Sequence, residues 1–156
     1  LRSCDQASGT RRCRDEVART KQARMISLDT SVLVRYVTKD HARLSPLALE
    51  IITNNACFVS KAALMEMVFT LESVYRKGRD EIVTALRTIF GLTTVTVESQ
   101  GAAAHAISWY AKGMDFGDAM ILASSAGAEN VASFDRDFQR LASRIGATPR
   151  VVHFKA

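Results

Sequence analysis

The feature of this sequence that most constrains its fold is the alternation, from residue 25 onward, of short β-prone runs with longer stretches of helical pattern. The predicted strands cover residues 25–29, 56–59, 93–97, 131–134 and 149–153. The predicted helices cover residues 30–37, 46–52, 61–77, 80–90, 99–112, 116–126 and 136–145. Strands separated by whole helices require crossover connections, which produce parallel pairing with helices on both faces. We therefore expect a three-layer α/β/α sandwich with a mostly parallel sheet of about five strands.

Several of these predicted elements carry clear local signals at their ends. Ser45 stands at an expected helix N-cap, directly before Pro46 at the favoured first helical position. Asp80 is the expected cap of a later helix, and Gly91 is its expected stop. The run T-T-V-T-V at residues 93–97 is β-branched throughout and is the clearest strand of the chain.

The positive charge of the chain is concentrated in its first 24 residues. The formal net charge is +5 and the pI is about 9.4, and residues 1–24 alone hold seven Lys and Arg against three Asp and Glu. Because large apolar side chains are almost missing there, we interpret residues 1–24 as a basic, disordered leader that is not native to the domain. We expect Met25 to be the natural start and residues 25–156 to form the folded domain. A basic arm that touches nucleic acid is the alternative interpretation of the leader.

Cysteine usage and hydropathy predict the compartment. Cys4 and Cys13 lie in the leader, and only Cys57 lies in the folded domain. An odd number of cysteines without an export signal indicates a reducing, cytoplasmic compartment and no disulfide framework. Cys57, in the apolar run A-C-F-V, is expected to be a small buried hydrophobic residue. No run approaches the roughly 18 consecutive apolar residues that a membrane span requires, so we expect no membrane partner.

Several common catalytic motifs are missing from the sequence. Neither a G-x-G-x-x-G nor a G-x-x-x-x-G-K phosphate loop occurs, which argues against nucleotide binding by those routes. His41, His105 and His153 are isolated in the sequence, so a zinc site is not expected. The sequence has no G-x-S-x-G elbow, and Cys57 has no neighbouring base in the sequence. These observations direct attention to the carboxylates.

Acids follow two of the predicted strands and open a predicted helix. Asp29 and Asp135 end strands, and Asp115 and Asp118 stand at the start of the helix at residues 116–126. In a parallel α/β sheet the carboxyl ends of the strands face one crevice, so we expect Asp29 and Asp135 to lie in it. A purely structural alternative exists for Asp29, Asp115 and Asp135, because each directly precedes a helix and is a suitable N-cap.

Glu66 and Asp118 are harder to explain as structural residues. Each lies in an otherwise apolar helical stretch, where a carboxylate without a partner is costly to bury. Acids that converge without Lys or Arg beside them repel one another and raise their own pKa values. A bound divalent cation relieves that repulsion, and all-oxygen ligands favour a hard ion such as Mg²⁺ or Mn²⁺.

Four segments, in this order, carry a resemblance to a known family. They are I-S-L-D-T-S-V-L-V at residues 26–34, A-L-M-E-M-V at residues 63–68, D-F-G-D-A-M-I-L-A at residues 115–123 and S-F-D-R-D-F at residues 133–138. Over residues 25–156 the chain resembles the PIN-domain ribonucleases and, among them, the VapC-type toxins of toxin–antitoxin pairs. The resemblance leaves the leader uncovered and implies the PIN-like version of the α/β/α fold.

The resemblance also implies a set of site residues. The catalytic and metal-binding quartet of the family falls on Asp29, Glu66, Asp118 and Asp135. Asp115 matches a further acid of secondary rank among the metal ligands. Thr30 and Ser133 match positions whose hydroxyls help to hold water or phosphate.

The implied activity is hydrolysis of RNA phosphodiester bonds with one or two Mg²⁺ or Mn²⁺ ions. Since no histidine lies in the matching segments, we expect water, not the ribose 2′-hydroxyl, to be the nucleophile, which leaves a 5′-phosphate. The implied partners are the RNA substrate, a second copy of the chain in a homodimer, and a small antitoxin protein that occupies a groove near the site.

Basic side chains suggest where RNA is bound. Arg136, Arg140 and Arg144 recur at i, i+4 and i+8 and therefore share one face of a predicted helix. A second basic cluster covers residues 76–79. A solvated surface is the alternative to a phosphate-binding track for both. The helix at residues 62–75 is apolar on more than one side, which predicts either deep burial or an interface.

Two other function classes remain open at this point. A phosphatase of the haloacid-dehalogenase type also places an Asp after its first strand, but it requires D-x-D where this chain has D-T-S at residues 29–31. A non-catalytic PIN module would act as a binding or regulatory subunit of a DNA-bound complex. The intact acid quartet argues against the second class.

Overall fold

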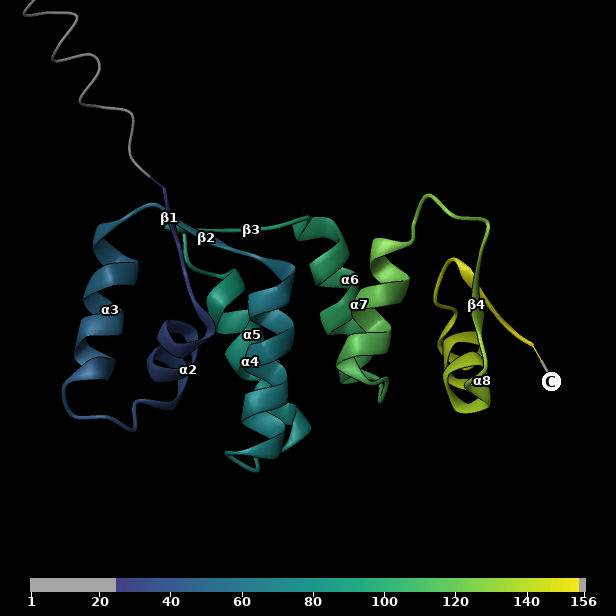
Figure 1. Cartoon of the computed structure of the whole chain (residues 1–156), viewed down its shortest axis with the longest axis horizontal. Helices are drawn as coiled ribbons and strands as arrows, with labels where there is room; N and C mark the ends of the chain where they lie inside the picture. The colour runs from purple at the N-terminus through teal and green to yellow at the C-terminus, as the bar shows by residue number, and fades with distance from the viewer. Residues whose placement is uncertain (1–24, 155–156) are drawn as a thin grey trace, which may run out of the picture.

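Short strands alternate with helices in the computed structural model, which describes residues 25–154 (Figure 1). The strands are β1 (Ile26–Ser27), β2 (Cys57–Val59), β3 (Val95–Val97), β4 (Asn130–Ser133) and β5 (Arg150–His153). The helices are α2 (Thr30–Thr38), α3 (Leu44–Asn54), α4 (Lys61–Ser73), α5 (Arg79–Phe90), α6 (Gln100–Ala111), α7 (Phe116–Ser124) and α8 (Arg136–Ile145). The predicted leader lies outside the described residues. The observed order of elements is the predicted one.

Element ends differ from the predictions where tertiary or backbone geometry decides them. Helix α4 ends at Ser73, before the predicted end at residue 77, because the chain turns at Arg76, whose φ of 54° is left-handed. Helix α3 begins at Leu44, ahead of Pro46, so Ser45 is a helical residue and not the cap. Helix α5 has Gly78 as its N-cap, so Asp80 lies inside its first turn.

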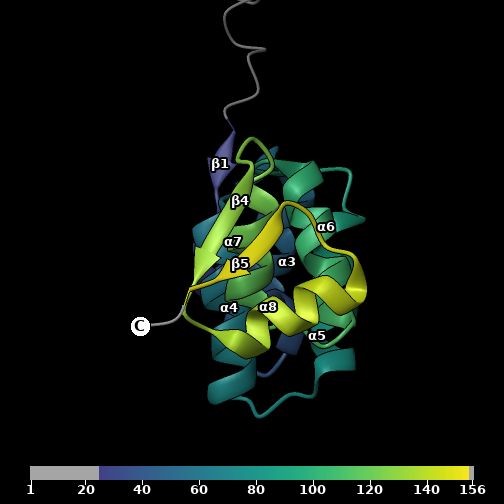
Figure 2. The same cartoon turned by 90° about the vertical axis from the view of Figure 1, so that its right-hand side faces the viewer.

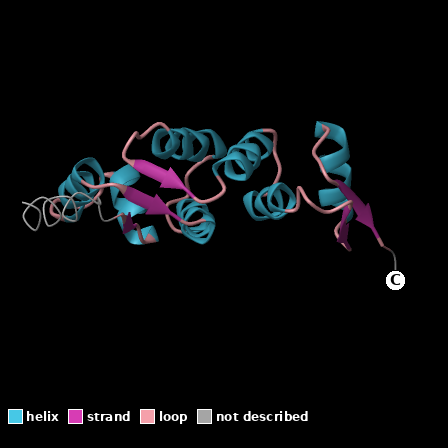
Figure 3. Cartoon of the chain, turned by 90° about the horizontal axis from the view of Figure 1, so that it is seen from above, coloured by secondary structure: helices cyan, strands magenta, loops and turns pink. Residues whose placement is uncertain are grey.

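All five strands are parallel to their neighbours, as predicted for this fold class, but they form two sheets. The first sheet has the order β1-β2-β3, with Ile26 opposite Cys57 and Cys57 opposite Val95. The second sheet pairs β4 with β5, with Ser133 opposite His153. Seen from above, helices separate the two groups of strands (Figure 3). The predicted α/β/α class with parallel strands is confirmed, and the strands are grouped as three plus two instead of in a single sheet.

The two sheets are separated by the path of the chain after α7. Residues 125–128 form a hydrogen-bonded turn in which the Ser125 N–H donates to the Leu122 carbonyl and the Ala128 N–H donates to the Ser125 carbonyl. Beyond this turn, β4, α8 and β5 pack mainly on one another, and we call them the C-terminal unit. Helices α6 and α7 lie between this unit and β1 (Figure 1), and the unit forms one end of the molecule (Figure 2). The sequence pattern specifies the strands but not this turn.

The core lies between the first sheet and the helices around it. Fully buried side chains come from α4 and α5 above all, since each of these helices turns one apolar face inward. The largest of them are Tyr110, Leu33, Ile52, Leu64, Met67, Ile82, Leu86, Ile89, Met114 and Leu122. In the C-terminal unit, α8 buries Phe138 and Ala142, and β5 buries Val151.

Cys57 is completely buried in β2, as predicted for a small hydrophobic residue. Burial raises the pKa of its thiol, so the thiol stays protonated and unreactive at neutral pH. None of the helices within residues 25–154 combines the length and the apolar character needed to cross a membrane.

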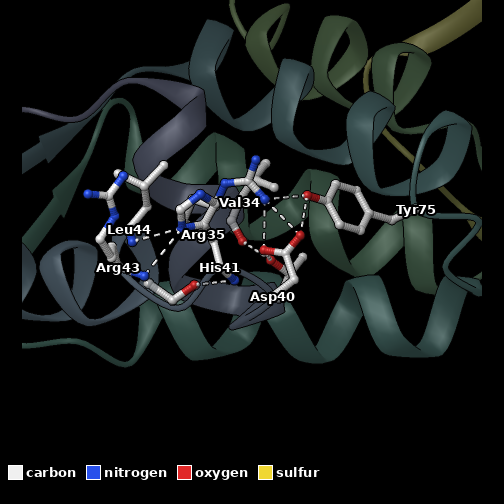
Figure 4. A network of polar contacts seen from close by, with 9 residues as sticks. Val34, Arg35, Asp40, His41, Arg43, Leu44 and Tyr75 are labelled. Atoms are coloured by element: carbon white, nitrogen blue, oxygen red, sulfur yellow. Dashed lines mark hydrogen bonds and ion pairs between the residues drawn. The ribbon is translucent and has the colours of Figure 1, made fainter.

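A polar network fixes the carboxyl end of α2 (Figure 4). The Arg35 guanidinium donates to both carboxylate oxygens of Asp40, at 2.8 and 2.7 Å, and to the Tyr75 hydroxyl at 2.9 Å. The Tyr75 hydroxyl donates in turn to Asp40 at 2.8 Å, and the Thr38 hydroxyl donates to Asp40 at 2.7 Å. These bonds lower the pKa of Asp40 far below its ordinary value, with the Arg35 hydrogen bond as the largest cause. The network ties α2 to the segment that follows α4.

Candidate functional site

Asp29 leaves β1 and caps α2, which begins at the next residue. One carboxylate oxygen, Oδ2, accepts hydrogen bonds from the Ser31 hydroxyl at 2.6 Å and the Ser31 N–H at 3.0 Å. These bonds from Ser31 lower the pKa of Asp29, so it is ionised at neutral pH. The other carboxylate oxygen takes no part in the Ser31 bonds and is available to a ligand.

Thr30 links Asp29 to Glu66. The buried Thr30 hydroxyl donates to Glu66 Oε2 at 2.8 Å, which joins the start of α2 to the middle of α4. Glu66 itself is exposed, and the Thr30 hydroxyl is a hydrogen-bond partner of its carboxylate. Its flanking residues divide between the two sides of the helix, because Met67 faces the core and Met65 faces outward. Asp29, Thr30 and Glu66 form the first acid group.

Asp115 caps α7 in the same way that Asp29 caps α2. Its Oδ1 accepts from the N–H of Gly117 at 2.8 Å and from that of Asp118 at 3.1 Å. A Cβ atom at position 117 would stand only 3.0 Å from that oxygen, so glycine allows the carboxylate to fold back over the first turn. Gly117 is not among the residues predicted from the sequence, although the D-x-G spacing of residues 115–117 is a usable signal.

Asp118, in the first turn of α7, is half-buried. Burial is the largest cause of a raised pKa at Asp118, and the charges of Asp115 and Asp135 raise it further. The carboxylate of Asp118 therefore lies close enough to both acids to be repelled by them. Asp115, Asp118 and Asp135 form the second acid group.

Asp135 leaves β4 and caps α8. Its Oδ1 accepts from the N–H groups of Asp137 at 2.8 Å and Phe138 at 3.1 Å, and its own N–H donates to the Ser133 hydroxyl at 2.9 Å. Ser133 thus shapes the turn that presents Asp135. Strand register places His153 of β5 directly opposite Ser133, a proximity that the isolated histidine in the sequence did not reveal.

Helices α4 and α7, which carry Glu66 and Asp118, pack against each other. A Cβ at Gly117 would lie 3.9 Å from the Met65 side chain, so the neighbours of Asp118 and Glu66 touch. Within residues 25–154, none of the five acids forms an ion pair with Lys or Arg. Nor do three of these side chains converge closely enough, within that range, to hold a metal ion. The donor atoms suit a hard divalent cation, but this arrangement divides them.

The basic residues differ in what they contact. Arg136, Arg140 and Arg144 are exposed along α8, where Arg140 makes a loose 3.6 Å contact with Asp137. The cluster at residues 76–79 is largely structural. Lys77 pairs with Glu81, and Arg79 lies over the Tyr110 ring and donates to the carbonyls of Tyr110 and Met114. The α8 arginines are thus the better candidates for binding phosphate.

Helix α4 has one buried and one exposed apolar face, so the predicted burial holds for one face and an interface on the other face stays a prediction. Leu64, Met67, Val68 and Leu71 are buried, whereas Met65 and Phe69 are exposed, Phe69 to 67%. Ile121 of α7, one turn beyond Gly117, is also exposed. These three side chains form an apolar surface beside the acids, which we call the α4–α7 surface.

Comparison with known proteins adds the family. Curated proteins give no match to the chain. The model of the PIN domain matches residues 26–144, which include every acid and both hydroxyl residues described above. PIN domains are in general nucleases that use divalent metal ions. Because this match extends over more than half of its length, the chain belongs to the PIN-domain family.

Proposed function

We propose that the chain is a metal-dependent endoribonuclease that hydrolyses RNA phosphodiester bonds and acts in the cytoplasm as the toxin of a toxin–antitoxin pair. Family membership gives the general class, nuclease. The RNA substrate, the Mg²⁺ or Mn²⁺ ion and the toxin role are the parts that we propose.

The proposal rests on the hydrogen bonds of the five acids and on the lack of ion pairs to them within residues 25–154. Asp29, Asp115 and Asp135 each use a single carboxylate oxygen for helix-cap bonds. The second oxygen of each lies outside those bonds, and no Lys or Arg of residues 25–154 neutralises any of the five acids. Purely structural caps do not explain Glu66 or the half-buried Asp118, which lies near two other negative charges. A cation-binding role accounts for all five.

The chain itself supplies orientation and charge. The cap bonds fix the carboxylates of Asp29 and Asp135 relative to their helices, and the Thr30 hydroxyl fixes Glu66. When a divalent ion is bound, it activates water and offsets the negative charge of the phosphodiester. Asp29, Glu66, Asp118 and Asp135 would hold that ion, with Asp115 in support, which requires the two acid groups to come together. Thr30 and Ser133 would position water or phosphate.

The experiment is cleavage of RNA by the full chain and by single-residue variants with Mg²⁺ or Mn²⁺ present. Asp29→Asn and Asp118→Asn should each lower the cleavage rate by about 100-fold or more, because each removes a charge that the reaction requires. The matched control is Asp80→Asn, since Asp80 is an exposed aspartate in the first turn of α5, outside the acid groups. Its rate should equal that of the wild type.

Circular dichroism of each variant separates loss of activity from loss of fold. Cleavage by well-folded Asp29→Asn at the wild-type rate would contradict the proposal. An equal loss of rate in Asp80→Asn would also contradict it, because the effect would then not be specific to the acid groups.

The proposed partners are a small antitoxin protein and a second copy of the chain. The α4–α7 surface supports a protein partner, since Met65, Phe69 and Ile121 are exposed apolar side chains next to the acids. An antitoxin bound there would lie close enough to the acid groups to block access of RNA. Two measurements test this part of the proposal. The antitoxin should co-purify with the chain, and adding purified antitoxin to the chain should abolish its RNase activity.

A further inference from the structure

Strands β1 and β4 each have an open edge, at which no other strand of residues 25–154 pairs. Strand β1 pairs with β2 alone, and β4 pairs with β5 alone. An open strand edge presents unpaired N–H and C=O groups and is a template for pairing with another strand. Both strands already belong to parallel sheets, so their edges suit a parallel partner.

The side chains of both strands are exposed to a degree that parallel sheets rarely show. Strands of parallel sheets are normally covered on both faces. Here Ile26 of β1 is 39% exposed and the preceding Met25 is 54% exposed. Phe134, directly after β4, is 82% exposed. Exposed apolar side chains thus lie in β1, directly before it, and directly after β4.

The path of the chain directs β4 away from the β1 of the same molecule. Helices α6 and α7 lie between the two strands (Figures 1 and 3). The turn at residues 125–128 is held by backbone bonds and by the Ser125 hydroxyl, which donates to the Ile121 carbonyl at 2.8 Å. Pairing with β1 of the same chain would require the C-terminal unit to move past α6 and α7. Pairing with β1 of a second chain leaves the turn at residues 125–128 as it is.

We propose that β4 of one chain pairs in parallel with β1 of a second copy, so that two copies exchange their C-terminal units. The exchange is reciprocal, because each copy offers one β1 edge and one β4 edge. A two-fold dimer therefore leaves neither edge open, which is the symmetric closure expected of an exchanged dimer. Each resulting sheet has five parallel strands.

The exchange also joins the acids across the dimer. Asp29 lies two residues after Ser27, and Asp135 lies two residues after Ser133. Pairing that sets Ser27 opposite Ser133 therefore brings Asp29 of one copy beside Asp135 of the other. This consequence for catalysis rests on the proposed function, whereas the pairing of the strands does not.

Disulfide trapping tests the strand pairing without any measurement of activity. The full chain carries Ile26→Cys with Ala132→Cys, or Ser27→Cys with Ser133→Cys, with Cys4→Ser and Cys13→Ser to remove other reactive thiols. Paired strands bring such cysteines within disulfide range. Mild oxidation should convert most of the protein into a dimer of about twice the 17.1 kDa chain mass on non-reducing gels. A matched control, Ile26→Cys with Ala104→Cys on the exposed side of α6, should stay monomeric on those gels.

Two outcomes would overturn the pairing. A disulfide formed within one chain, seen as a monomer in which only the Cys57 thiol remains free, would mean that β4 closes on its own β1. Free thiols in both designed pairs, with no dimer, would mean that the two edges do not pair at all.

Mixing two inactive variants tests whether the site is shared. Asp29→Asn and Asp135→Asn are unfolded together in urea and refolded in equal amounts. Half of the dimers are then mixed, and one of the two sites in each mixed dimer has both acids, so about a quarter of wild-type RNase activity should return. No return of activity from an active wild type would overturn the shared site. An inactive wild type would refute the proposed function, and the disulfide result would still decide the strand exchange.

Discussion

Asp29, Asp115 and Asp135 can each serve as a helix cap and as a metal ligand. From the sequence, each was either a helix cap or a metal ligand, and the structure places each at a helix N-terminus with one oxygen in the cap bonds. The two interpretations are compatible because a carboxylate has two oxygens and a cap uses only one of them here. A cap also fixes the carboxylate in space, which a ligand requires.

Asp118 is an acid whose charged form the fold disfavours. Its pKa is raised from the ordinary value of 3.8, so its ionised form is less stable in the folded state than in the unfolded state. The cost is present above the folded pKa and disappears as the pH falls through it. Asp118→Asn should therefore raise the melting temperature by a few degrees at pH 7 without divalent metal, while it abolishes activity.

Thermal unfolding followed by circular dichroism checks this prediction. Glu129→Gln is the control, because it also removes one negative charge but lies in the exposed connection after α7. Its melting temperature should not rise. A lower melting temperature for Asp118→Asn than for the wild type would contradict the proposed cost of the ionised Asp118 carboxylate.

The pKa of Asp40 is shifted in the opposite direction to that of Asp118. Its hydrogen bonds hold its pKa far below 3.8, so its ionised form stabilises the fold at neutral pH. This stability is complete above pH 4 and is lost as the pH falls toward the lowered pKa. Asp40→Asn should lower the melting temperature at pH 7, and the difference from the wild type should shrink as the pH falls below 4. A difference that is the same at pH 7 and pH 3 would contradict this explanation.

At the scale of whole elements, the sequence predicted the type and the order of the helices and strands correctly, but it misplaced several of their ends. Helix α8 was predicted with its observed limits, because Asp135 caps it and Gly146 ends it with a left-handed φ of 67°. Helix α4 ended early for a reason that its pattern does not contain. Its apolar side chains continue to Val74, but the backbone turns at Arg76 and Tyr75 bonds to the Asp40 network.

The exposed arginines of helix α8 are expected to bind RNA phosphates. Arg140→Glu with Arg144→Glu should weaken RNA binding and lower the slope of log K against log salt by about 1.4, if each arginine neutralises one phosphate of single-stranded RNA. Fluorescence anisotropy with labelled RNA at several salt concentrations measures both quantities. Arg87→Glu on α5, which is also exposed, is the matched control and should leave the slope unchanged. An unchanged slope in the double variant would make the α8 arginines an ordinary solvated surface.

At the scale of the whole molecule, periodicity predicted five parallel strands between helices but not how the strands are grouped. Each strand carries the same backbone groups on both edges, so the sequence of β1 does not say which strand lies beyond it. The turn after α7 decides that, through local hydrogen bonds among small residues. The acids were predicted individually for the same reason, and their division into two groups follows from the separation of β1 and β4.

Removing the metal ion and adding it back tests whether these acids support metal-dependent cleavage of RNA. The full chain is treated with EDTA, freed of EDTA by gel filtration, and assayed on end-labelled RNA with and without added Mg²⁺ or Mn²⁺. We expect no cleavage without metal and full recovery on addition of either ion, with products that carry a 5′-phosphate. Cleavage at the same rate in EDTA, with 2′,3′-cyclic phosphate ends, would contradict this expectation.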